Sequence, residues 1–190
     1  MTPHPTRIVV GVTGASGAVY ARLLVQELLR QPAITEIALI HSANGVAVAE
    51  YEGQLIVTDD PRIRRFDNAD MFAAPASGSA GYEAMIVVPC SMGTAGRIAC
   101  GVSDSLLTRA ADVMLKERRP LLLVPRETPL SGIHLRNLAT LSSAGAIVIP
   151  ASPSFYSLPA TLDALCMTVV ERIVALLGFD APHYEWNSRA

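Results

Sequence analysis

The stretch RIVVGVTGASG, residues 7–17, decides the fold of this chain. Its first six residues form an apolar run typical of a buried strand, and the glycines after it open a helix predicted over residues 17–29. In a parallel α/β sheet such a turn lies at the carboxyl end of the strand, where free backbone N–H groups can bind a phosphate. The stretch therefore predicts a strand, a nucleotide-binding turn and a helix.

The rest of the chain alternates apolar runs with helical patterns. Further strands are predicted at residues 36–41, 84–88, 121–124 and 146–149, and helices at 43–51, 94–100, 105–118 and 159–177, with another around His134. The polar segment 53–81 is predicted to be an irregular binding loop. Unbroken apolar strands are typical of sheets buried on both faces. The pattern predicts an α/β fold, a Rossmann-like doubly wound parallel sheet in a single three-layer domain over residues 1–190, with its core at about 7–178 and a tail at 179–190.

The composition favours a protein that associates with copies of itself. Apolar residues make up 51% of the chain and charged residues 17%, yet no apolar run approaches the roughly 18 to 20 residues that span a bilayer. We therefore expect a homo-oligomer that buries part of its surface. The net charge of −2 disfavours nucleic acid as a partner. Three widely spaced cysteines and an N-terminus without a secretory pattern predict a reducing cytoplasm.

The glycine-rich turn favours a mononucleotide over a dinucleotide. No Lys follows its last glycine, as a Walker A loop requires, and glycines at 11, 14 and 17 do not fit the dinucleotide spacing. The second predicted strand ends in His41 and Ser42, where dinucleotide folds place an acid for the ribose hydroxyls. Thr13 and Ser16 add hydroxyl donors to the turn.

The second half of the chain carries a set of specific strings. A second loop with small and hydroxyl residues, PCSMGT at 89–94, follows the third predicted strand. After it come RAADVMLKERRP at 109–120, PRETPL at 125–130, IHLRN at 133–137 and PSFYSLP at 153–159. In this order, and after a Thr-Gly-Ala-Ser-Gly turn, these strings closely resemble the UbiX-type flavin prenyltransferases over nearly the whole chain, from about residue 8 to 178.

The resemblance implies a metal-independent prenyltransferase. Its substrates are FMN and dimethylallyl phosphate, and its product, prenylated FMN with new bonds at N5 and C6, serves UbiD-type decarboxylases. The subunits form a dodecamer with active sites at subunit junctions. The matched flavin-binding positions are Thr13, Gly14, Ala15, Ser16, Ser42, Ser91, Met92, Gly93, Thr94 and Arg126. Those that handle the prenyl phosphate are Lys116, Tyr156 and Arg172, with Arg109 close by.

Four side chains are candidates for catalysis. Ser16, Arg126 and Glu127 match residues of the family site, and so does one acid after the second strand, which is either Glu52 or Glu50. A leaving phosphate requires fixed cations, and a proton must move during ring closure. Arginine, lysine and carboxylate side chains gathered across a subunit interface would supply both.

Some features of the sequence leave alternatives open. Met71 stands where relatives can carry Trp, which could change the pocket, and Trp186 could partly replace it. An FMN-dependent decarboxylase of the cysteine type would carry a His in the helix 43–51 and a Pro-Ala-Ser-Ala-Asn-Thr loop, and this chain has neither. A non-catalytic flavin carrier would have no use for the cations around Arg126. A monophosphate or diphosphate donor, and the downstream pathway, stay open.

Overall fold

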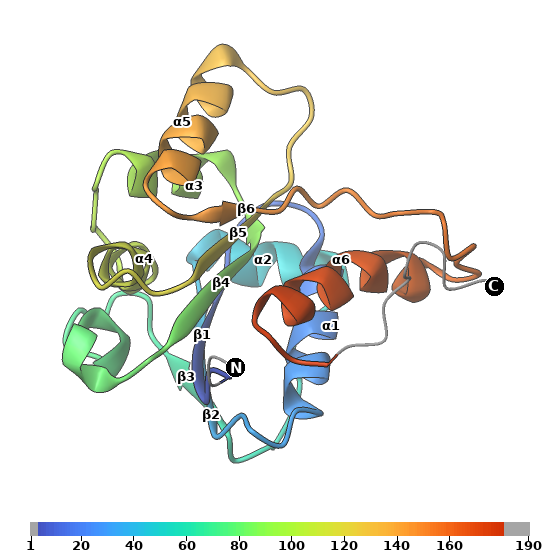
Figure 1. Ribbon diagram of the computed structural model, residues 1–190, viewed down its shortest axis with the longest axis horizontal. Helices are drawn as coiled ribbons and strands as arrows, with labels where there is room; N and C mark the ends of the chain where they lie inside the picture. The colour runs from blue at the N-terminus through green and yellow to red at the C-terminus, as the bar shows by residue number, and fades with distance from the viewer. Residues whose placement is uncertain (1–3, 181–190) are drawn as a thin grey trace.

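The computed structural model describes residues 4–180, which form one α/β domain around a six-stranded sheet (Figure 1). The strands are β1 (Arg7–Val12), β2 (Glu36–His41), β3 (Ile63–Phe66), β4 (Ala84–Cys90), β5 (Leu121–Pro125) and β6 (Ile147–Val148). Every neighbouring pair is parallel, and the strand order is β3-β2-β1-β4-β5-β6. This is the order of the Rossmann fold, so the predicted fold class is confirmed.

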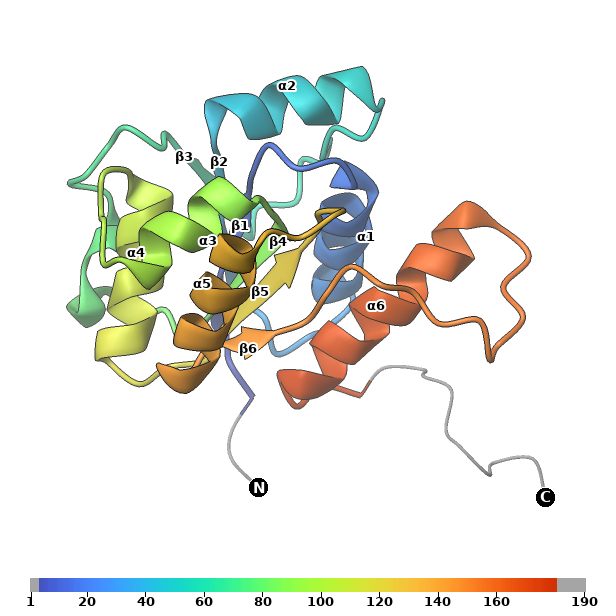
Figure 2. The same cartoon turned by 90° about the horizontal axis from the view of Figure 1, so that it is seen from above.

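Helices cover both faces of the sheet (Figure 2). They are α1 (Ala18–Leu29), α2 (Ala43–Tyr51), α3 (Met92–Ala99), α4 (Leu106–Lys116), α5 (Gly132–Ser143) and α6 (Leu162–Leu176). Alternate residues of a strand point to opposite faces. Val10 accordingly packs with residues of α1 and α6, and Val9 packs with residues of α3 and α4. The chain thus builds the three predicted layers, and the strand order reverses between β1 and β4.

The segment 53–81 differs from its prediction as a wholly irregular loop. It contains β3, which pairs with β2 from Ile37–Ile63 to Ile40–Phe66, and two short 3-10 helices, Ala74–Ala76 and Gly78–Ala80. The prediction was wrong here because β3 is an edge strand. Arg64 and Arg65 are exposed on it, so the strand has no unbroken apolar run to reveal it.

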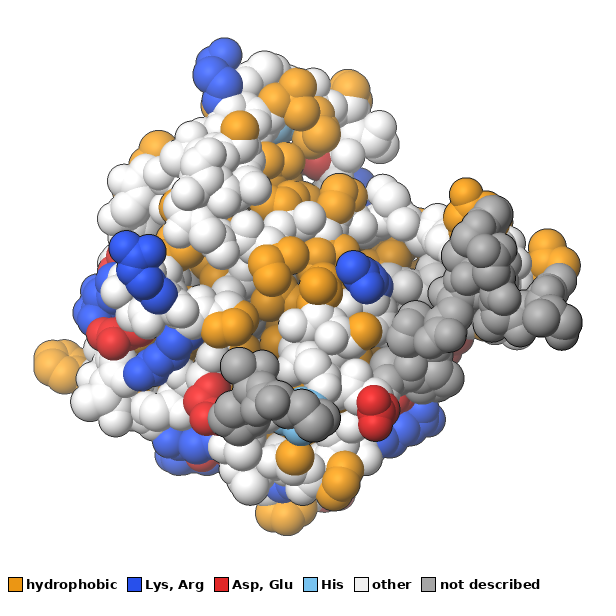
Figure 3. Space-filling model, viewed as in Figure 1, with side chains coloured by type: hydrophobic (Ala, Val, Ile, Leu, Met, Phe, Trp, Pro, Cys, Tyr) orange, Lys and Arg blue, Asp and Glu red, His pale blue; other side chains and the backbone are white. Residues whose placement is uncertain are grey.

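The surface carries exposed apolar side chains in separate places (Figure 3). The segment 152–161, called the arm below, leaves β6 and projects from the body before α6 begins (Figures 1 and 2). Phe155 and Leu158 on the arm and Ile133 on α5 are all more than half exposed. Among residues 4–180, no helix combines the length and apolar character needed to cross a bilayer.

Candidate active site

Hydrogen bonds connect the loops after three strands, β1, β2 and β4, at the carboxyl edge of the sheet. The Thr13 hydroxyl donates to the carbonyl of Pro89 at 2.7 Å and accepts from the backbone N–H of Ser91 at 2.8 Å. The N–H of Ser42 donates to the carbonyl of Val12 at 2.9 Å. The sheet therefore brings the predicted flavin loops, at 13–16, 42 and 91–94, to one place.

Ser16, Glu52 and Arg126 meet at the N-terminus of α1, and we call them the edge group. Arg126 Nε donates to the Ser16 carbonyl at 3.0 Å. The Glu52 carboxylate accepts from the N–H groups of Gly17, at 3.0 and 3.1 Å, and Ala18, at 2.8 Å. The two residues of this group that lie 110 positions apart in the sequence, Ser16 and Arg126, are thus in direct contact.

The structure separates the two acids that the sequence left as alternatives. Glu52 ends α2 and turns its carboxylate toward α1, whereas Glu50 is exposed. Burial raises the pKa of Glu52, but hydrogen bonds from the Ser16 hydroxyl and the two amides, together with the charge of Arg126, outweigh it and hold the pKa below its usual value. The amides where the sequence predicted a phosphate anchor are therefore engaged by a carboxylate.

A small cavity at Ser42 and Thr94 lies where the N-termini of helices come together. Ser42 caps α2 and Ser105 caps α4, each by accepting a backbone N–H with its hydroxyl. The cavity measures about 150 Å³, and its lining residues are Ser42, Asn68, Thr94, Arg97, Asp104, Ser105, Leu107 and Thr108. Helix N-termini carry partial positive charge, and Arg97 adds a full one, paired with Asp104 at 3.4 Å. The arrangement suits a small anion.

Of the residues that line this small cavity, only Ser42 and Thr94 are among those predicted from the sequence. Asn68 comes from the loop after β3 and is held by its side-chain oxygen, which accepts the N–H of Leu107 at 2.9 Å. Arg97 and Asp104 come from the end of α3 and the turn before α4. No spacing in the sequence relates these three polar positions, because the strand order alone brings them together.

A larger cavity of about 390 Å³ is lined in part by Arg126. Its lining residues are Pro125, Arg126, Glu127, Thr128, Leu130, Leu138, Pro150, Ala151 and Ser152. The Glu127 carboxylate accepts the N–H of its neighbour Thr128 at 3.1 Å and otherwise stands at the wall of this space. Arg126 and Glu127 therefore line this cavity, directly after the buried strand β5.

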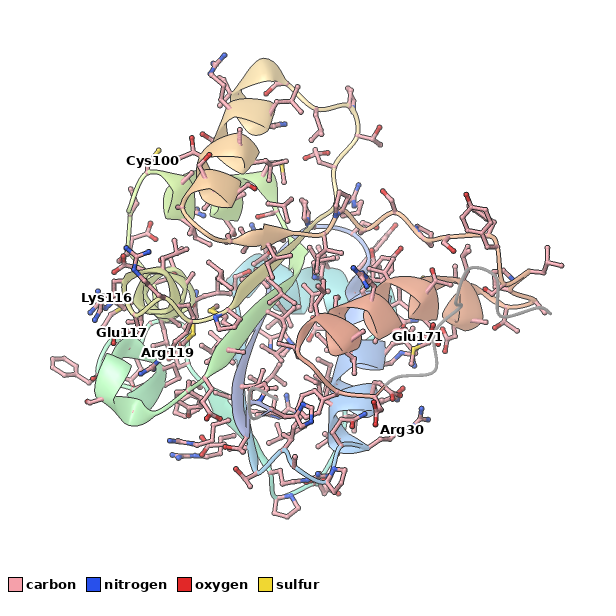
Figure 4. The ribbon with its side chains drawn as sticks, viewed as in Figure 1. Arg30, Cys100, Lys116, Glu117, Arg119 and Glu171 are labelled. Atoms are coloured by element: carbon pink, nitrogen blue, oxygen red, sulfur yellow. The ribbon has the colours of Figure 1, made fainter. Side chains whose placement is uncertain are left out.

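Arg109 and Lys116, the α4 cations, lie elsewhere in the subunit. Lys116 ends α4, five residues before β5 begins, while Arg126 follows the end of β5, so the two lie toward opposite edges of the sheet. Arg109 donates to the Asp112 carboxylate at 2.6 Å and to the Ala76 carbonyl at 3.1 Å. Lys116 pairs with Glu117, beside it at the end of α4 (Figure 4). Among residues 4–180, the hydrogen bonds and ion pairs of these two cations go to groups other than Arg126.

The remaining predicted residues lie on the surface or outside the described part. Tyr156 is 65% exposed on the arm, and Arg172 is exposed on α6. Met71, before the first 3-10 helix, is 39% exposed. Trp186 lies outside the described residues.

The cysteines and histidines of the site region do not form a second reactive centre. Cys90 is fully buried at the end of β4, and burial raises the pKa of its thiol to about 12. Burial, followed by the nearby charge of Arg65, lowers the pKa of His41. His134 closes a capping box with Ser131 at the start of α5, a structural role. Within the described part of the chain, no three His, Cys, Asp or Glu side chains could hold a metal ion together.

This strand order, with glycine- and hydroxyl-rich loops at its carboxyl edge, defines a nucleotide-binding α/β protein of the flavoprotein class. The family model described as Flavoprotein matches residues 2–177. A protein named flavin prenyltransferase UbiX, from Chlamydia muridarum, is 41% identical over 183 residues, which cover 93% of this chain and 94% of that protein. The chain belongs to the flavin prenyltransferase family.

Solved structures of similar proteins share this fold. A dodecameric FMN-dependent UbiX-like decarboxylase from Escherichia coli O157:H7 superposes with a TM-score of 0.89 at 39% identity, over 96% of this chain and 100% of that one. The protein AnUbiX (PadA1), solved with FMN and dimethylallyl pyrophosphate, gives a TM-score of 0.88 at 39% identity, over 98% and 100% of the two chains.

Proposed function

We propose that this chain transfers a dimethylallyl group from dimethylallyl phosphate to reduced FMN and makes prenylated FMN. The observation that carries the proposal is the contact between the glycine-rich turn and Arg126, with Glu52 held beside both. In the reaction the allylic C–O bond breaks and the phosphate leaves with the bonding electrons. The new carbon bond to N5 replaces the N5 proton, which the departing phosphate takes up. In ring closure the prenyl double bond gains a proton, and the bond to C6 forms with loss of the C6 proton.

The flavin is assigned to the carboxyl edge of the sheet. Its binding residues are Thr13, Gly14, Ala15, Ser16, Ser42, Ser91, Met92, Gly93, Thr94 and Arg126. Because Glu52 engages the first amides of α1, we assign the flavin phosphate to the small cavity at Ser42 and Thr94, near Arg97. The ring system then lies toward Ser16 and Arg126. The hydroxyl, amide and guanidinium groups present there fit such a ligand.

The chemistry is assigned to groups on both sides of the flavin. Ser16, Glu52 and Glu127 hold or move protons, and Arg126 stabilises the departing phosphate. The prenyl phosphate is assigned to Lys116, Tyr156 and Arg172, with Arg109 nearby. Since Lys116 lies toward the opposite ends of the strands from Arg126 in one subunit, we assign the α4 cations to a site shared with a neighbouring copy. A dodecamer, as in the UbiX-like structure from Escherichia coli O157:H7, supports this assignment.

The product implies a recipient. We propose that prenylated FMN passes to a decarboxylase of the UbiD type, which uses it as cofactor. Release of a reduced, modified flavin suits a reducing compartment, and the three cysteines are free thiols. The cytoplasm is the proposed location.

The mass of the flavin after reaction tests the proposal. Purified protein is incubated under anaerobic conditions with reduced FMN and dimethylallyl phosphate, and in parallel with the diphosphate. A mass gain equal to one prenyl group is expected. An unchanged flavin that still binds tightly would indicate a carrier. Release of carbon dioxide from a peptide with a C-terminal cysteine would indicate the cysteine-type decarboxylase.

A further inference from the structure

Arg22, on α1, binds two elements at once. Its Nε donates to the side-chain oxygen of Gln54 at 2.6 Å, and its Nη2 donates to both carboxylate oxygens of Asp163, at 2.8 and 2.9 Å. The Arg22 side chain is 22% exposed, against 54% for Asp163. A planar guanidinium can hold two partners in fixed directions, which an ammonium cannot do. Arg22 therefore links the chain after α2 to the start of α6.

Gln54 is rigidly connected to Glu52. Glu52 ends α2, and Gly53 adopts the left-handed conformation with φ of 64°. The N–H of Gly53 donates to the carbonyl of Glu50 at 3.1 Å, and the N–H of Gln54 to that of Ala49 at 2.8 Å. These two bonds form a Schellman motif, which fixes the turn. A force that holds Gln54 against α1 therefore also fixes the backbone that carries Glu52.

Asp163 is rigidly connected to the arm. It lies in the first turn of α6, where the helix end favours its negative charge. Thr161 caps this helix by accepting the N–H of Ala164 at 3.1 Å. The arm with Tyr156 leads directly into this turn, and α6 packs along α1 (Figures 1 and 2). The Arg22–Asp163 pair therefore anchors the base of the arm to the helix whose N-terminus holds Glu52.

We propose that Arg22 is a positioning residue for the transfer step. Through Gln54 it keeps the Glu52 carboxylate on the amides of Gly17 and Ala18, and through Asp163 it sets the arm that presents Tyr156. This inference rests on the proposed function. The matched family positions do not include Arg22, Gln54 or Asp163.

The test separates the two contacts of Arg22. Arg22→Met keeps the length of the side chain and removes both contacts; Gln54→Leu removes one without a change of charge, and Asp163→Asn weakens the other. Because the Glu52 carboxylate and Tyr156 would both be misplaced, Arg22→Met should lower kcat for prenylated FMN formation about tenfold and raise the KM for dimethylallyl phosphate about fivefold. Gln54→Leu should lower only kcat, and Asp163→Asn should raise only KM. Arg22→Lys should recover part of the loss.

The matched control is Arg30→Met on the same helix. Arg30 is 71% exposed and pairs with Glu27, which is 6% exposed, so its loss can lower stability. It lies at the opposite end of α1 from Glu52, so kcat and KM should stay within about twofold of wild type. FMN affinity should change little in any of these variants. A double variant, Arg22→Met with Gln54→Leu, should lower kcat no further than Arg22→Met alone, because the two residues act through one contact.

The pH profile distinguishes positioning from simple stabilisation. Glu52 faces Arg126 and the donors Ser16, Gly17 and Ala18. If Gln54→Leu moves the carboxylate from those donors, its pKa rises and the acid limb of kcat shifts to higher pH. If the wild type is active and Arg22→Met and Arg30→Met have the same kcat, KM and pH profile, the role of Arg22 is overturned while the proposed function stands. Should Arg22→Met fail to fold, the split between Gln54→Leu and Asp163→Asn decides. Wild type that makes no prenylated flavin would overturn the proposed function itself.

Discussion

The edge group and the α4 cations are held in different ways. Ser16, Glu52 and Arg126 contact one another or a shared helix end, within a single chain. Arg109 and Lys116 instead pair with acids of their own helix, Asp112 and Glu117. The first group is complete in one subunit because parallel strands deliver their loops to one edge. In the proposed site the second group is supplied by another subunit, so that one half of the proposed site would depend on the fold and the other half on the assembly.

The largest expected effect tests whether Lys116 and Arg126 of one site come from different subunits. Lys116→Met and Arg126→Met, each in every subunit, should lower kcat about 100- to 1,000-fold, because each removes a cation that stabilises the leaving phosphate. When the two variants are co-expressed and the mixed oligomers purified, activity should return to about a quarter of wild type. That share is expected if each site takes Lys116 from one subunit and Arg126 from another at random.

The control for this experiment is a mixture made after separate purification, without exchange of subunits. It should stay as inactive as the single variants. Mixed oligomers with no recovered activity would mean that both cations act within one chain, contrary to the comparison.

The acids Glu52 and Glu50 provide a matched test of the edge group. Glu52→Gln should lower kcat about 100-fold, as expected when a positioned proton-transfer group is lost. Glu50→Gln changes the same charge two residues away on an exposed position and should leave kcat within about twofold. Steady-state rates of prenylated FMN formation measure both. A larger loss of kcat in Glu50→Gln than in Glu52→Gln would contradict the proposal and assign the role to Glu50.

The sequence predicted which loops lie at the carboxyl edge of the sheet, but not which of their side chains contact one another. The glycine turn and the loop at 89–94 lie at the carboxyl edge because each follows a buried apolar strand, and this could be predicted. The choice between Glu52 and Glu50 could not, since it depends on where α2 ends and on the turn at Gly53. Strand β3 was not predicted because Arg64 and Arg65 interrupt its apolar residues. The partners of Arg22 lie 32 and 141 positions away, beyond the reach of any local pattern.

The smallest predicted effect concerns the glycines of the flavin loops. A Cβ at Gly93 would lie 4.0 Å from its nearest neighbour within the chain, the Arg97 guanidinium, whereas one at Gly14 would lie 2.4 Å from Asn44 Cβ. Gly93→Ala should therefore keep or slightly raise the melting temperature, because alanine favours the helix that begins there, yet weaken FMN binding about tenfold.

Gly14→Ala provides the contrast to Gly93→Ala, since its Cβ would force α2 away from the turn and so lower the melting temperature as well as FMN affinity. Flavin fluorescence titration and thermal denaturation measure the two quantities. If Gly93→Ala binds FMN as tightly as wild type, the flavin does not approach the start of α3 closely. The half of the site that one chain builds would then leave out the start of α3 and be confined to the edge group and Ser42.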